Sequence, residues 1–223
     1  MNEIGSEVAE LYLYGTIREA YPWDEEEDCI SAKRVMGALK ELKGKPINAH
    51  INSNGGDAFE SIAICNLFKQ HDADINIYID SMAASGASII ATAGKNVYMF
   101  ANSMQMIHNA WTYASGNSKE LRKTADDLDK LDLSVKASYM SKFVGTEEEL
   151  EKLLADESYL TVAECLAFGL CTEIIVAKEV TPEPLAPENN IRETLFNKYS
   201  KKINTETEKQ NLFKNFTKTK GVI

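Results

Sequence analysis

The sequence contains no apolar run that approaches the roughly 20 residues needed to cross a lipid bilayer. Residues 1–7 are acidic, and they lack the basic start and the apolar core of a secretory signal peptide. These two absences predict a cytoplasmic protein that has no membrane partner.

Cysteine is scarce, and the spacing of the four cysteines does not favour metal binding. Cys29, Cys65, Cys165 and Cys171 do not form the closely spaced pairs that are typical of metal sites. A structural disulfide is not expected in the cytosol. Cys65 and Cys165 fall within apolar helical patterns, so we expect buried thiols there. The sequence therefore predicts no metal site, and it indicates no cofactor.

Basic residues are also fewer than acidic residues in the sequence. The formal net charge of −10 argues against broad nucleic-acid binding. The charge is uneven, because residues 191–223 carry eight Lys or Arg against three Glu, whereas the preceding 190 residues carry a net −15. A proline-rich stretch at 181–187 separates the two parts. We therefore predict one domain over residues 1–177, followed by a linker and a basic tail over 178–223 that does not join the core.

Hydrophobic periodicity predicts an α/β domain in which strands and helices alternate. Because strands separated by helices pair in parallel through right-handed crossovers, we expect a parallel sheet. The acidic run within residues 21–28 is expected to be a solvated loop. The predicted strands are 10–15, 47–53, 75–79, 95–100, 104–108 and 170–176, and the predicted helices are 32–42, 58–70, 89–93, 118–143, 147–155 and 162–168. Ser31, Thr146 and Thr161 are expected to cap the helices that follow them.

The stretch from 80 to 88 consists almost entirely of small residues and joins a predicted strand to a predicted helix. Ser85 lies at this junction, where the free N–H groups of a helix N-terminus favour a developing negative charge. A nucleophilic serine needs this arrangement. A serine that merely caps the helix is the alternative interpretation.

Two glycines are candidates for the groups that would stabilise an oxyanion. In a parallel sheet the carboxyl ends of neighbouring strands meet at one edge, so the predicted turn at 54–57 lies beside the stretch that holds Ser85. The N–H groups of Gly56 and Gly86 could then form an oxyanion hole. An ordinary Asn-Gly turn is the alternative for the first of them.

A general base and an acid complete the candidate site. His108 ends a predicted strand at the same edge of the sheet, whereas His50 and His71 look structural. Asp156 and Glu157 form an acidic pair that could supply a carboxylate to orient the imidazole. A histidine at a strand end and an acidic pair in a loop are each more often structural.

Several short motifs follow one another along this chain. They are INSNGGD at 51–57, SMAAS at 81–85, MIH at 106–108, and YLT at 159–161 with Glu164 and Gly169-Leu170. In this set the chain resembles the Clp protease proteolytic subunit (ClpP) family of serine peptidases, over residues 11–176. The resemblance implies the ClpP/crotonase-like fold, a ring of identical subunits, and a protruding handle helix at 118–143.

The resemblance also implies roles for individual residues. Ser85 matches the nucleophile, His108 the general base, and Gly56 and Gly86 the oxyanion-hole amides. The third member of the triad matches at Glu157, where the family usually has aspartate, and Asp156 remains the alternative.

In two features the chain departs from the housekeeping subunit and resembles the phage and prophage branch of the family, the head maturation proteases. The chain begins near its first core strand, and it carries the basic tail. This branch implies cleavage of scaffold and capsid precursors in the host cytoplasm without an ATPase. The alternatives are a housekeeping ClpP subunit that works with an AAA+ unfoldase, a crotonase-type acyl-CoA enzyme, and a non-catalytic assembly protein.

Overall fold

The computed structural model describes residues 8–25 and 29–176 of the chain. The predicted linker and basic tail at 178–223 lie outside these residues. No helix in the two described ranges is long and apolar enough to cross a membrane. The strands are β1 (Ala9–Ile17), β2 (Ile47–Gly56), β3 (Ile75–Ala84), β4 (Val97–Phe100), β5 (Met104–Ile107), β6 (Ser158–Thr161) and β7 (Glu173–Ile175). The helices are α1 (Ala32–Glu41), α2 (Ala58–Lys69), α3 (Gly86–Ala91), α4 (Ser118–Met140), α5 (Glu147–Ala155) and α6 (Val162–Ala167).

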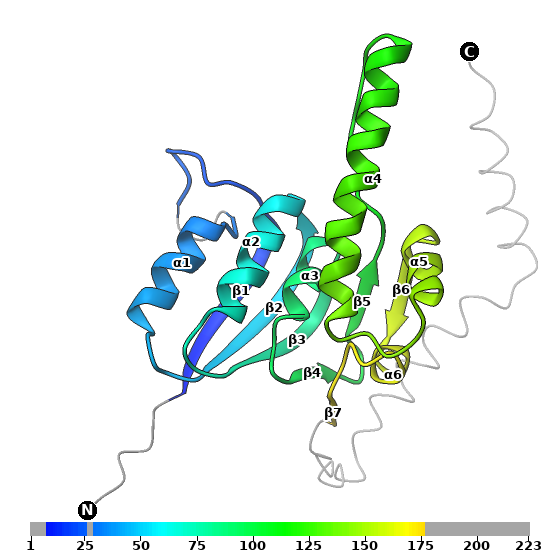
Figure 1. Ribbon diagram of the computed structural model, residues 1–223. Helices are drawn as coiled ribbons and strands as arrows, with labels where there is room; N and C mark the ends of the chain where they lie inside the picture. The colour runs from blue at the N-terminus through cyan, green and yellow to red at the C-terminus, as the bar shows by residue number, and fades with distance from the viewer. Residues whose placement is uncertain (1–7, 26–28, 177–223) are drawn as a thin grey trace, which may run out of the picture. The chain divides into compact units, whose positions relative to one another are not determined.

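The central sheet is parallel, with the strand order β1-β2-β3-β4-β7 (Figure 1). β5 pairs in parallel with the end of β3 and antiparallel with β6. Burial alternates along β2, so its buried residues Ile47, Ala49 and Ile51 face the helices. The opposite face carries His50, whose ring stacks between Tyr12 and Tyr78. The structure thus confirms the α/β class and the parallel sheet.

The strands that lead to the candidate site are longer than the sequence pattern predicts. The prediction of a turn at 54–57 is wrong, because β2 continues through Gly55 and Gly56. These two residues pair with Thr16 and Ile17 of β1. Backbone pairing with β1 supplies partners that a local pattern cannot reveal. β3 likewise extends to Ala84, because β5 pairs along its last residues.

The remaining differences are the ends of two helices and one additional strand. α3 begins at Gly86, earlier than the predicted 89, and α4 ends at Met140, earlier than the predicted 143. β6 was not predicted as a strand, because its four residues acquire a partner only through β5. Helix caps follow the sequence closely, since Ser31, Thr146 and Thr161 each accept the expected hydrogen bond from the first turn.

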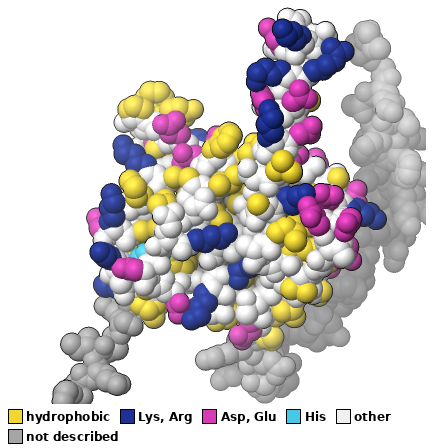
Figure 2. All heavy atoms as spheres, viewed as in Figure 1, with side chains coloured by type: hydrophobic (Ala, Val, Ile, Leu, Met, Phe, Trp, Pro, Cys, Tyr) yellow, Lys and Arg dark blue, Asp and Glu magenta, His cyan; other side chains and the backbone are white. Residues whose placement is uncertain are grey.

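α4 has 23 residues and projects from the body of the domain (Figure 1). Its outer part is covered with charged side chains (Figure 2). Near its carboxyl end, Val135, Ser138 and Tyr139 are buried against the core. This end packs within the domain, and it brings α4 to the residues around Ser85.

Candidate active site

Ser85 lies at the sharp turn between β3 and α3, in a backbone conformation that is rare for a residue with a side chain. Its φ is 53° and its ψ is −124°. Such a conformation costs on the order of 1–3 kcal/mol and persists only where the surroundings enforce it. Ser85 occupies the N-cap position, but its side chain forms no capping hydrogen bond. The interpretation as a capping serine is therefore wrong.

The hydroxyl of Ser85 points instead to His108. Ser85 Oγ and His108 Nε2 are 2.7 Å apart, a hydrogen-bonding distance. His108 directly follows β5, and only 9% of its surface is exposed. The two residues come from neighbouring parallel strands, as the sequence pattern predicts, and the sheet brings them together.

A buried network beneath the turn holds Ser85 in place. The Ser85 N–H donates to the Met106 carbonyl at 2.8 Å. Ser88 Oγ lies 2.6 Å from the Ser85 carbonyl oxygen and 2.7 Å from the Tyr139 hydroxyl. Burial raises the pKa of Tyr139, so its hydroxyl stays protonated and can donate to Ser88. The network connects the turn to β5 and α4, and no sequence pattern pointed to Ser88 or Tyr139.

The electrostatic surroundings of His108 suit a general base. Burial lowers the pKa of the imidazole, and the negative charges of Glu157 and Asp132 partly oppose this shift. Because the pKa stays below its usual value, the ring is neutral at neutral pH and can accept a proton.

Of the two candidate acids, Glu157 is the one whose charge acts on His108. Its φ of 49° makes it the other non-glycine residue with a positive φ in the described chain. Asp156 instead ends α5, where its N–H donates to the Lys152 carbonyl. Within residues 8–25 and 29–176, neither acid hydrogen-bonds to the imidazole, so Glu157 acts on it through charge alone in this structure.

Glycines let the ends of β2 and β3 approach closely. A Cβ added to Gly55 would lie 2.5 Å from the Ala84 carbonyl oxygen and 2.8 Å from the Gly86 nitrogen. A Cβ added to Gly86 would lie 2.0 Å from Ser61 Oγ and 3.7 Å from the Gly56 nitrogen. The backbone nitrogens of Gly56 and Gly86 are therefore near neighbours beside Ser85. Gly55 and Ser61 were missed as site residues, because their role lies in contacts between strands and helices.

An open cavity of about 680 Å³ lies in front of Ser85 and His108. Its lining is mainly apolar, and hydrophobic side chains gather near the base of α4 on the face that Figure 2 shows. The cavity can hold an extended peptide segment with an apolar side chain. Apolar or aromatic lining comes from Phe59, Met106, Trp111, Leu128 and Leu131.

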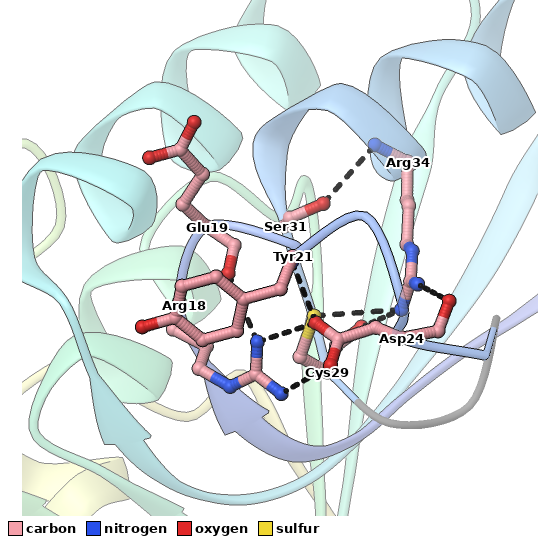
Figure 3. A network of polar contacts seen from close by, with 7 residues as sticks. All are labelled: Arg18, Glu19, Tyr21, Asp24, Cys29, Ser31 and Arg34. Carbon is pink, nitrogen blue, oxygen red and sulfur yellow. Dashed lines mark hydrogen bonds and ion pairs between the residues drawn. The ribbon is translucent and has the colours of Figure 1, made fainter.

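The segment that follows β1 is held by a polar network (Figure 3). Arg18 forms an ion pair with Asp24 at 2.6 Å, and the Tyr21 N–H also donates to Asp24. The Arg18 guanidinium lowers the pKa of Asp24 to about 2. The side chain of Asp24 is only 6% exposed, so the prediction of a solvated acidic loop is wrong at this position. The network holds the chain just beyond Thr16 and Ile17, which pair with the glycines of β2.

The four cysteines are free and buried, as expected for Cys65 and Cys165. Burial raises the pKa of Cys165 to about 12, so this thiol is not a nucleophile at neutral pH. Within the described cavity, the hydroxyl of Ser85 lies at hydrogen-bonding distance from an imidazole, which is the arrangement that a nucleophilic serine needs.

Comparison with known protein families identifies the family of this domain. The family model for Clp protease matches residues 24–178, a span that includes Gly56, Ser85, His108 and Glu157. The match covers well over half of the chain. The protein belongs to the Clp protease family of serine peptidases.

Proposed function

We propose that the protein is a serine endopeptidase in which Ser85 is the nucleophile and His108 the general base. The observation that carries this proposal is the 2.7 Å contact between Ser85 Oγ and a buried imidazole, within a Clp protease domain. Glu157 orients and stabilises the imidazolium, and the N–H groups of Gly56 and Gly86 bind the oxyanion.

Cleavage proceeds in two steps on these groups. Ser85 Oγ attacks the scissile carbonyl carbon while its proton passes to His108 Nε2, and the carbonyl oxygen becomes an oxyanion between the two glycine amides. When the tetrahedral intermediate collapses, the C–N bond breaks and the imidazolium protonates the leaving amine. A water molecule then gives a proton to His108 and attacks the acyl-enzyme, which releases the acid and restores Ser85.

The role of the acid can be tested by comparing two adjacent isosteric substitutions. We expect Glu157→Gln to lower kcat on the order of 10²-fold, because the charge that stabilises the imidazolium is lost. Asp156→Asn removes the same charge one residue away and is expected to change kcat only slightly. Hydrolysis of a fluorogenic peptide measures both. A larger loss in Asp156→Asn would transfer the role to Asp156.

The other enzyme class considered for this fold is less well supported. A crotonase-type acyl-CoA enzyme uses two backbone amides to hold a thioester enolate and does not need a serine paired with a histidine. The hydrogen bond between Ser85 and His108 therefore favours peptide hydrolysis over acyl-CoA chemistry.

We further propose that the peptidase is a head maturation protease, which assembles into a homo-oligomeric ring in the host cytoplasm and processes phage scaffold and capsid precursors without ATP. The charge distribution supports this choice, because an acidic main part is followed by a basic segment at 191–223 that could engage acidic scaffold proteins. The alternatives are a housekeeping subunit that depends on an AAA+ unfoldase and an assembly protein without catalytic activity.

The dependence on ATP distinguishes these alternatives. We expect the purified full-length protein to cleave scaffold and capsid precursor proteins at the same rate with and without ATP and a Clp-type AAA+ unfoldase. Cleavage that required both additions would favour the housekeeping function. If no peptide or protein were cleaved and no fluorophosphonate probe reacted, the non-catalytic alternative would be favoured.

A further inference from the structure

Asp132 connects α4 to the segment that carries His108. Its Oδ1 accepts a hydrogen bond from the Ala110 N–H at 2.7 Å. The adjacent Asn109 N–H donates to the Leu154 carbonyl of α5 at 3.2 Å. The two residues that follow His108 are therefore held from both sides, by a side chain of α4 and by the backbone of α5.

The carboxylate of Asp132 also contributes charge at the active site. Asp132 and Glu157 are the two acids whose charges favour the protonated form of His108. They approach from different elements, Asp132 from α4 and Glu157 from the turn between α5 and β6. The Ser85 hydroxyl faces the ring from the turn between β3 and α3.

Asp132 lies where α4 and α5 approach the segment that follows His108. A cavity of about 300 Å³ lies beside it, bordered by Asn109, Lys136, Glu151 and Leu154. Lys136 lies one helical turn further along α4, and it forms ion pairs with Glu147 and Glu151 of α5. Lys136 is thus paired with α5, while the Oδ1 of Asp132 accepts from the His108 segment.

We propose, on the basis of the peptidase function above, that Asp132 is a positioning residue that fixes the His108 segment to α4 and contributes a second negative charge that acts on the imidazole. The hydrogen bond sets where the segment runs, and therefore where Nε2 lies relative to Ser85 Oγ. The charge adds to that of Glu157 when the imidazolium forms in the transition state. Asp132 does not touch the reacting atoms.

Two substitutions separate these two contributions. Asp132→Asn keeps an oxygen that can accept from the Ala110 N–H and removes the charge, whereas Asp132→Ala removes both. Removing a negative charge near an imidazole lowers its pKa, so the rising limb of kcat/KM against pH should move to lower pH in Asp132→Asn. Asp132→Ala should in addition lose about 10²-fold in kcat/KM at all pH values, because the segment is no longer held.

The experiment measures pH–rate profiles of the full-length protein with a fluorogenic peptide. Asp129→Asn serves as the matched control, since Asp129 is an exposed acid one turn earlier on α4. We expect the control to keep the wild-type profile, and the double variant Asp132→Asn/Glu157→Gln to lower kcat/KM further than either single variant, because both charges stabilise the same imidazolium.

The proposal is overturned if the Asp132→Asn profile superimposes on that of the wild type, or if Asp132→Ala retains full kcat/KM. Asp132→Asn preserves the shape of the side chain and its hydrogen-bonding oxygen. If Asp132→Ala fails to fold, the pH profile of Asp132→Asn therefore still tests the proposal. A failure of the peptidase function itself is distinguishable, because the wild-type protein would then show no hydrolysis that depends on Ser85.

Discussion

Replacing Ser85 with alanine is expected to reduce peptide hydrolysis to background, a loss of at least about 10⁴-fold in kcat. The substitution removes the oxygen that would form the acyl-enzyme, and His108 Nε2 loses the partner that lies 2.7 Å away. Reaction with a fluorophosphonate probe should disappear as well. The measurements are hydrolysis of a fluorogenic peptide and probe labelling followed by mass spectrometry.

The matched control for this substitution is Ser81→Ala. Ser81 is an exposed serine of the same strand, β3, and lies four residues before the turn. We expect the control to keep wild-type activity and labelling at Ser85. Labelling of the Ser85→Ala variant as strong as that of the wild type would contradict the assignment of the nucleophile. The variant should also be folded, because the hydrogen bond from the N–H of residue 85 to the Met106 carbonyl is kept.

Replacing Gly55 with alanine is expected to lower kcat on the order of 10²- to 10³-fold. The added methyl would lie within 2.8 Å of Gly86 N, Ser85 Cβ and the Ala84 carbonyl oxygen, which belong to the turn that carries the nucleophile. Two of these atoms are backbone, so the ends of β2 and β3 must separate. That movement displaces the Gly56 amide from its place beside Ser85, and the oxyanion loses a donor.

Gly44→Ala is the control for this second prediction. Gly44 and Gly55 have similar positive φ values, 74° and 88°, but a Cβ at Gly44 would meet nothing within 4 Å. Gly44→Ala should lose about 1–2 kcal/mol of stability from backbone strain, and Gly55→Ala should lose more because of the added clash, which thermal unfolding measures. Only Gly55→Ala should lose activity when both are folded. Equal kcat in the two variants would show that the close approach of the strands is not needed for catalysis.

The sequence was informative wherever an interaction is local. A helix cap joins residues three positions apart, so Ser31, Thr146 and Thr161 could be identified from spacing alone. The alternation of strands and helices likewise predicted a parallel sheet, and a parallel sheet brings its carboxyl ends to one edge. For this reason Ser85 and His108 could be proposed as partners although they are far apart in the chain.

The structure differed from these predictions where the partner of a residue lies outside the spacing of its own helix, strand or turn. The turn predicted at 54–57 is strand, because β1 supplies pairing partners to Gly55 and Gly56. Asp24 was expected in solvent, but Arg18 pairs with it and its side chain is nearly buried. In each case a tertiary contact outweighed a local tendency, and no local pattern contains information about that contact.

By itself the sequence predicted the fold class, the order of the elements other than β6, the helix caps and the residues proposed to carry the chemistry. These follow from periodicity, from spacing and from the rule that parallel strands share an edge. Only the tertiary structure decided that Ser85 adopts a strained turn instead of a helix cap, that Ser88 and Tyr139 support it, and that Asp132 holds the segment of His108. These features are decided by packing and hydrogen bonds between distant elements, whose geometry exists only once the sheet and α4 are assembled.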